Sequence, residues 1–160
     1  MIKDILKILE NDARTTTKQI ATMTGLPNTE VDKTIKQAEK DRTILKYKTL
    51  INWGKVENGN VWALIDVKVT PQKSVGFDSI AEHICRFGQV RSLYLASGDY
   101  DLVILVMGKS EHEVADFVSQ KLSSIEGVQG TETHFILKRY KEDGEVLEIE
   151  EELKRLPVIL

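Results

Sequence analysis

Lysine and other polar side chains recur at helical spacing between residues 29 and 40. In a helix, this segment buries one stripe of apolar residues and exposes an opposite face that consists of Thr29, Lys33, Lys36, Gln37 and Lys40. Lysine amines bind phosphate oxygens, and polar side chains of a helix can reach base edges in a DNA major groove about 12 Å wide. The pattern therefore predicts a nucleic-acid interface. The alternative is the solvated face of a helical bundle that binds a protein or nothing.

The residue types and spacings of the sequence do not form a catalytic or metal-binding set. Gly108-Lys109-Ser110 has the residues that end a phosphate loop, but Val103 occupies the position of the required first glycine. None of the three histidines lies four residues from another histidine or a cysteine. Asp99 and Asp101 could act as paired acids, but nothing near them in sequence supplies a nucleophile. We expect no metal, no cofactor and no enzymatic activity, and a small enzyme of ferredoxin-like fold is the weakest alternative.

Three short helices with a tight turn are predicted in a first domain, residues 1–51. The apolar spacing indicates helices over Ile2–Glu10, Lys18–Thr24 and Thr29–Lys40. Gly25 suits the left-handed position after the second helix, and Asn28 is a good N-cap for the third. This order is the helix-turn-helix pattern, in which two helices hold the third in a major groove.

A second domain is predicted after a linker. Weak alternation over residues 44–51 indicates one or two short strands, and residues 52–60 are rich in Asn and Gly, as linkers are. Residues 61–141 then alternate between strand and helix patterns. The expected elements are a strand over 61–69, a helix over 74–87, strands over 90–96 and 101–107, a helix over 110–124 and a strand over 128–138. This βαββαβ order is the ferredoxin-like arrangement, whose open sheet face a second copy could cover.

The segment from 142 to 160 is acidic, with seven acidic and two basic residues. Val146, Ile149, Leu153 and Leu156 lie at helical spacing, and Pro157 would end a helix. We expect an amphipathic helical tail, and strand pairing through residues 146–149 is the alternative.

Charge separates the two halves of the 160-residue chain. Residues 1–57 contain 11 basic and 8 acidic residues, whereas residues 58–160 contain 11 and 17. A basic end joined to an acidic end suggests that the first part contacts a polyanion. The longest apolar run, Leu102–Met107, is far shorter than the roughly 20 residues that cross a bilayer, and the N-terminus lacks a signal-peptide pattern. We expect a cytoplasmic protein without membrane contact, and the single Cys85 excludes an intramolecular disulfide.

Three stretches resemble the Lrp/AsnC family of bacterial and archaeal transcription regulators. They are ILKILENDARTTTKQIATMTGLPNTEV at 5–31, ILKYKTLIN at 44–52 and LASGDYDLVILV at 95–106. The resemblance implies an α+β chain, with a winged helix-turn-helix domain followed by a ferredoxin-like effector and oligomerisation domain. It also implies sequence-specific binding to double-stranded DNA under the control of a small effector, commonly an amino acid. In this family the sheets pair back to back, and the dimers often assemble into octamers.

The same resemblance implies an effector site between dimers, near the Gly-Asp hairpin. Carried over by position, the site would use Leu95, Ser97, Gly98, Asp99, Tyr100, Asp101 and His134. Free N–H groups at a glycine turn can hold a carboxylate, and an aspartate can hold an ammonium group. The alternative is a structural hairpin, in which the glycine supplies a positive φ and the aspartates bond the turn backbone.

The sequence departs from the family in its third helix, which is usually richer in arginine and here has a net charge near zero. The expected DNA contacts are Arg14, Thr17, Asn28, Thr29, Lys33, Lys36, Gln37, Lys40, Lys46 and Lys48. Arg42 stands where the family usually closes this helix with glycine, and Arg resists the left-handed conformation. These departures keep open a second interpretation, a metabolite-binding oligomer whose DNA binding is weakened or lost.

Overall fold

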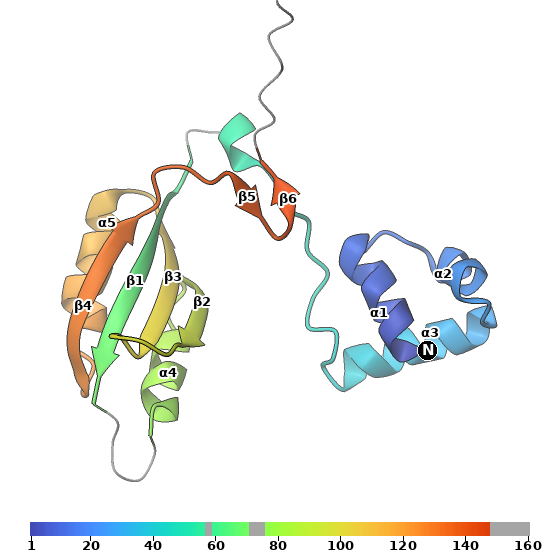
Figure 1. Ribbon diagram of the computed structural model, residues 1–160, viewed down its shortest axis with the longest axis horizontal. Coiled ribbons are helices and arrows are strands. Elements are labelled where there is room, and N and C mark those ends of the chain that lie inside the picture. The colour runs from blue at the N-terminus through green and yellow to red at the C-terminus, as the bar shows by residue number, and fades with distance from the viewer. Residues whose placement is uncertain (57–58, 71–75, 148–160) are drawn as a thin grey trace, which may run out of the picture. The chain divides into compact units, whose positions relative to one another are not determined.

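The structure is a computed structural model that describes residues 1–56, 59–70 and 76–147. The chain divides into two compact units, Met1–Ile51 and Asn52–Leu160, and Figure 1 shows the elements of each.

The first unit is a bundle of three helices. They are α1 (Ile2–Asn11), α2 (Thr17–Thr24) and α3 (Asn28–Lys40). Each helix contributes apolar side chains to one buried cluster, which consists of Ile5, Leu9, Ile20, Val31 and Ile35. This arrangement confirms the predicted helix-turn-helix pattern and fixes which face of α3 remains outside.

The helix ends follow the capping residues in part. Thr16 caps α2 by accepting a hydrogen bond from the Gln19 N–H, and Gly25 ends the helix at a left-handed φ of 70°. The prediction that Asn28 caps α3 was wrong. The N-cap is Pro27, and Asn28 is the first helical residue. The fixed φ of Pro27 and its carbonyl, which accepts from the Val31 N–H at 3.1 Å, start the helix one residue earlier.

The predicted strands over residues 44–51 were also wrong, because the structure has no strand in that described segment. Its residues bond back to α3 and leave a sheet unformed. The Ile44 N–H donates to the Ala38 carbonyl, and the Tyr47 hydroxyl donates to Glu39 at 2.8 Å. A short strand is stable only when it pairs with another strand. Here residues of the segment form hydrogen bonds with α3 instead.

The second unit is built on an antiparallel sheet of four strands. Its elements in chain order are η1 (Trp53–Lys55), β1 (Val61–Val69), α4 (Asp78–Cys85), β2 (Val90–Leu95), β3 (Leu102–Gly108), α5 (Glu111–Asp116), η2 (Phe117–Leu122) and β4 (Val128–Phe135). The strand order is β2-β3-β1-β4, so the two central strands are the first and third of the βαββαβ series. This is the predicted ferredoxin-like arrangement.

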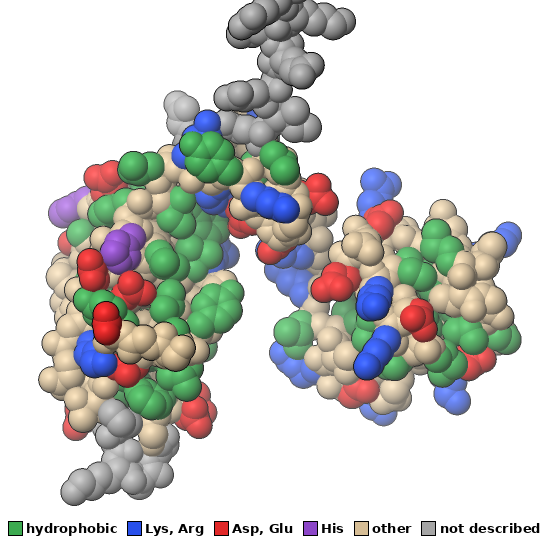
Figure 2. Space-filling model, in the orientation of Figure 1, with side chains coloured by type: hydrophobic (Ala, Val, Ile, Leu, Met, Phe, Trp, Pro, Cys, Tyr) green, Lys and Arg blue, Asp and Glu red, His purple; other side chains and the backbone are tan. Residues whose placement is uncertain are grey.

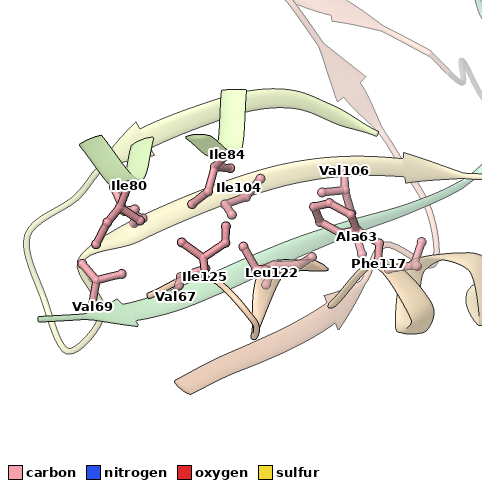
Figure 3. Packing of buried hydrophobic residues seen from close by; sticks show 13 residues of the cluster. Ala63, Val67, Val69, Ile80, Ile84, Ile104, Val106, Phe117, Leu122 and Ile125 are labelled. Carbon is pink, nitrogen blue, oxygen red and sulfur yellow. The ribbon is translucent and has the colours of Figure 1, made fainter. Parts of the chain in front are cut away.

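Both helical segments of this unit cover the same face of the sheet (Figure 1). Figure 3 shows Ile80 and Ile84 of α4, together with Phe117 and Leu122 of η2, packed against side chains of the strands, such as Ile104. All of them are less than 4% exposed. Burial of side chains of this size stabilises a fold by roughly 1.5–3 kcal/mol each. This apolar layer therefore stabilises the packing of the helices on the sheet.

Two predicted boundaries of this unit differ from the structure by three or more residues, and the others agree within two. The first helix begins at Asp78 rather than at 74, and residues 71–75 lie outside the described residues. The last strand ends at Phe135 rather than at 138. Leu137 has no buried position to occupy and is 95% exposed, so alternation of residue types alone overestimated the strand.

A short hairpin follows the sheet, with strands β5 (Lys141–Glu142) and β6 (Glu145–Val146). Its turn residues Asp143 and Gly144 both have positive φ, 46° and 87°, as a two-residue type I′ hairpin requires. Val146 therefore lies in a strand and not in the expected amphipathic helix. The rest of that predicted tail, residues 148–160, lies outside the described residues.

The face of the sheet opposite α4 and α5 carries apolar side chains. By strand alternation this face includes Leu64, Tyr94, Val103, Leu105 and Met107. Four of them are partly buried, and Tyr94 is 60% exposed. Figure 2 shows hydrophobic side chains over this sheet, with acidic and histidine side chains beside them.

Candidate nucleic-acid interface and ligand site

Helix α3 presents a polar face because its apolar residues are buried on the other side. Val31, Ile35 and Ala38 are no more than 9% exposed and pack inward. The predicted contact residues of this helix, Asn28, Thr29, Lys33, Lys36, Gln37 and Lys40, are all exposed. A helix held by its apolar stripe while its polar face is open has the form that major-groove readers use.

The charges on this face are partly used within the helix. The Lys36 amine lies 2.7 Å from the Asp32 carboxylate, one helical turn away. This hydrogen bond and charge raise the pKa of Lys36 above its ordinary value. Hydrogen bonds from Thr43, and a weaker one from Gln37, lower the pKa of Asp41. The carboxylates of Asp32 and Asp41 therefore interact with Lys36 and Gln37, two of the predicted contact residues in the C-terminal half of α3.

The remaining predicted DNA contacts lie elsewhere in the first unit. Arg14 is exposed in the turn between α1 and α2, where its N–H donates to Asp12 at 2.9 Å. Thr17 is the first residue of α2 and is half-buried. Lys46 and Lys48 are exposed in the segment after α3. Arg14, Lys46 and Lys48 add positive charge to the first unit, whereas α3 has as many acidic as basic residues.

The second unit has a hollow of about 560 Å³ at one end of its sheet. Its lining residues are Lys68, Asp99, Tyr100, Gln129, Gly130, Thr131 and Glu132. Two of the predicted effector residues, Asp99 and Tyr100, line it. The five others, Leu95, Ser97, Gly98, Asp101 and His134, are not among its lining residues. The sequence interpretation missed the residues of β1 and β4, because strand pairing and not sequence proximity brings them to the hairpin.

The hairpin before β3 is tied to strand β1 by charged groups. The Lys68 amine donates to the Asp99 carbonyl at 2.7 Å and lies 3.5 Å from the Asp101 carboxylate. That carboxylate also accepts the Val69 N–H at 2.9 Å. Asp101 therefore has the structural role that the sequence left open. Asp99 accepts from Lys68 through its backbone carbonyl and is one of the residues that line the hollow.

A second set of polar contacts joins the hairpin to β4. The Tyr100 hydroxyl donates to Glu132 at 2.8 Å, and this bond to a carboxylate raises the pKa of Tyr100. His134 lies outside the hollow on the same strand, and its Nε2 is 3.2 Å from Asp66 of β1. The hollow thus contains both signs of charge beside an amide and a hydroxyl, a lining that can bind a small polar molecule.

The described residues contain no group of three or more His, Cys, Asp or Glu side chains placed to hold a metal ion. Among those same residues, no helix is long and apolar enough to cross a bilayer.

The two units match two known kinds of domain. Residues 2–46 match the family model of a winged helix-turn-helix DNA-binding domain. Residues 62–146 match the Lrp/AsnC ligand binding domain. The combination defines a DNA-binding transcriptional regulator with a domain for a small ligand.

The chain belongs to the Lrp/AsnC family. It is 48% identical over 156 residues to the uncharacterized HTH-type transcriptional regulator YugG of Bacillus subtilis, a match that covers 97% of this chain and 94% of that protein. Two solved structures share the fold. AsnC of E. coli has a TM-score of 0.68 at 20% identity, with 88% of this chain and 93% of that one covered. The regulator NMB0573 of Neisseria meningitidis, solved as a complex with L-Met, has a TM-score of 0.67 at 23% identity, with 88% and 90% covered.

Proposed function

We propose that this regulator is a cytoplasmic homo-oligomer that binds double-stranded DNA through α3 and responds to an amino acid bound at the hollow of the second unit. The observation that carries the proposal is the exposed polar face of α3, in a chain that also has an Lrp/AsnC ligand binding domain. The role is regulatory and not enzymatic.

The DNA contacts that we propose are the ten predicted side chains. In a dimer, two copies of α3 would enter successive major grooves about 34 Å apart. Lys46, Lys48 and Arg14 would bind phosphates, and Asn28, Thr29 and Thr17 would contact the duplex near the start of α3. The acidic second unit repels DNA, which leaves the first unit as the contact surface.

An amino acid suits the hollow because both of its charged groups find a partner there. Asp99 and Glu132 can bind an ammonium group, and Lys68 in the same lining can bind a carboxylate. Gly98 lies in the adjoining hairpin, outside that lining, and its backbone N–H would add to the carboxylate site. Leu95, Ser97 and Asp101 belong to or border the hairpin between β2 and β3. His134 lies two residues after Glu132 on β4 and so faces the same side of the sheet. The L-Met complex of the related Neisseria regulator supports this ligand class.

Self-association is supported by the open face of the sheet. Apolar side chains of β1 and β3, with Tyr94 of β2, would be covered by the same face of a second copy. Pairs formed in this way could assemble further, up to the octamers that the family resemblance implies. Binding of an amino acid between such pairs can shift the assembly only if it binds one state more tightly.

Two experiments test the proposal. Gel-shift titration of the full chain against genomic fragments at about 50 mM salt should give discrete complexes, because phosphate contacts are strongest at low salt. Absence of binding at micromolar protein would reject the DNA-binding part. Thermal-shift screening with the twenty amino acids should raise the melting temperature for at least one, since a ligand at 100 times its Kd stabilises by about 2.7 kcal/mol. A flat screen would reject the amino-acid effector.

The second candidate is a metabolite-binding oligomer with weakened DNA binding. The ion pair between Lys36 and Asp32 favours it, because that lysine is partly neutralised before any phosphate approaches. Replacement of Lys33 and Lys36 by Ala distinguishes the two. DNA affinity that did not change in this variant would support the second candidate.

A further inference from the structure

The polar face of α3 contains residues of unequal availability. The Lys36 amine is hydrogen-bonded to Asp32 at 2.7 Å. The exposed Glu39 carboxylate accepts the Tyr47 hydroxyl at 2.8 Å. These internal bonds occupy groups that could otherwise face a ligand.

Lys33 is differently placed. It is exposed, and the described residues of its unit, which run unbroken from Met1 to Ile51, supply no hydrogen bond or ion pair to its amine. At 100° per residue it lies about 200° around the helix from Val31. Because the buried stripe is centred close to Val31, the side chain of Lys33 points almost directly away from the core.

The position of Lys33 along the helix also matters. It is the sixth of 13 residues of α3 and lies one turn after Thr29 on the same side. Lys40 faces the same direction but is the last residue of the helix. A recognition helix brings its N-terminal half to the base edges, so Lys33 is the cation that reaches deepest into a groove.

Lys36 lies elsewhere on the helix surface. It is about 140° from Val31 at 100° per residue, so it lies on the flank of the exposed face and not at its centre. Its partner Asp32 lies farther toward the buried side on that flank. A lysine held on the flank of a groove-binding helix faces the sugar-phosphate backbone, which carries no direct sequence information.

We propose that Lys33 reads a guanine in the major groove, while Lys36 contacts the DNA backbone and positions the helix. Guanine presents two acceptors there, N7 and O6, and a lysine amine can donate to both. This inference rests on the proposed DNA-binding function and names the base that one residue of that interface recognises.

The test compares two lysines that carry the same charge on the same helix. The full-length chain first selects duplexes from a random library, and each base pair of the selected site is then substituted in turn. Binding of each duplex is measured for the wild type, K33A and K36A. Circular dichroism and melting temperatures establish that both variants are folded, as expected for exposed positions.

For the wild type, replacement of one G·C pair in each half-site should weaken binding about 5- to 150-fold, the range expected for a good base contact. K33A should lose this discrimination at that pair and keep it at the others. K36A should bind all duplexes more weakly by a similar factor and show a shallower dependence on salt. K33Q should shift the preference at the same pair from guanine toward adenine, which glutamine binds.

The inference is overturned if K33A keeps the full base preference of the wild type at uniformly lower affinity, because Lys33 would then be a phosphate contact. It is also overturned if K36A, rather than K33A, removes discrimination at a single pair. A wild-type chain that selects no duplex would instead reject the proposed function itself, and the inference with it.

Discussion

The Asp101 carboxylate accepts the backbone N–H of Val69 at 2.9 Å, across 32 positions of the chain. The reverse connection is also present, because the Asp101 N–H donates to the Val67 carbonyl at 3.1 Å. One residue thus joins the hairpin before β3 to the end of β1. The position of Asp99 and Tyr100 at the hollow depends on this joint.

Replacement of Asp101 by Ala should destabilise the second unit by about 1–3 kcal/mol, the usual cost of leaving a partly buried polar group without its partner. Urea denaturation monitored by circular dichroism measures this change. The control is D99N, two residues away in the same hairpin, whose side chain is exposed and makes no such bond to β1. D99N should keep the stability of the wild type and weaken amino-acid binding. Equal stability of D101A and the wild type would contradict the structural role of Asp101.

Arg42 adopts a left-handed φ of 61° just after α3. The sequence predicted this strain, because a bulky residue stands where glycine would fit the left-handed conformation. The R42G variant should gain up to about 1 kcal/mol, since the left-handed region costs a non-glycine residue roughly 1–2 kcal/mol and the greater flexibility of unfolded glycine offsets part of that.

The R42A variant is the control for this effect. It removes the same side chain and charge but keeps the Cβ, so it should not gain that stability. Both variants are compared by denaturant unfolding of the full chain. An alanine variant as stable as the glycine variant would show that side-chain or charge effects, and not backbone conformation, determine the difference.

The sequence predicted the helices and strands well where a regular pattern follows from one buried face. Strand β1 alternates between buried and less buried residues from Ala63 to Val69, and the apolar stripe of α3 has clear helical spacing. These patterns arise from local geometry, 3.6 residues per turn or two per strand repeat. They fix the fold class, because only a few arrangements bury such faces together.

The parts that the sequence did not predict depend on contacts between distant residues. Lys68 and Glu132 belong to the hollow only because β1 and β4 pair, with Asp66 opposite Glu132 and Lys68 opposite Gly130. The hairpin at Asp143-Gly144 has a local turn signal, but the helical spacing that begins at Val146 outweighed it in the prediction. The Asp32–Lys36 pair was detectable from its spacing of four residues, which often places opposite charges together.

The bond between Tyr100 and Glu132 gives a prediction for alkaline pH. A tyrosine that donates to a carboxylate resists ionisation, and its pKa is accordingly raised. The un-ionised form is the one that the folded state favours, so this contribution is complete below the ordinary tyrosine pKa of about 10. It is lost as the pH rises through the raised value. Ultraviolet titration should show one tyrosine fewer among the late-ionising groups in Y100F.

The E132Q variant tests the cause of this shift. It removes the carboxylate charge while keeping an acceptor oxygen, so Tyr100 should ionise at lower pH than in the wild type. Tyr47, whose pKa is also raised by burial and by Glu39, serves as an internal reference that E132Q leaves unchanged. A titration curve identical in E132Q and the wild type would contradict the assignment.

The open face of the sheet predicts how the chain self-associates. Leu105 lies at the centre of this face, paired with Leu64 of β1 and Ser92 of β2. A charged side chain there would have to be desolvated in a dimer formed through the sheet, which costs several kcal/mol when no partner is present. L105E should therefore shift the chain toward monomers in analytical ultracentrifugation while the monomer stays folded, because the side chain projects away from the core.

The control for this prediction is L45E, which places the same charge on a residue of the first unit that is already 75% exposed. L45E should sediment as the wild type does. If L105E kept the wild-type assembly and L45E disrupted it, association would run through the helical unit and not through the sheet.

Because a dimer sets the distance between its two copies of α3, L105E should also weaken binding to a site of two half-sites far more than to one half-site. A loss of affinity equal for both duplexes would separate DNA binding from association through the sheet.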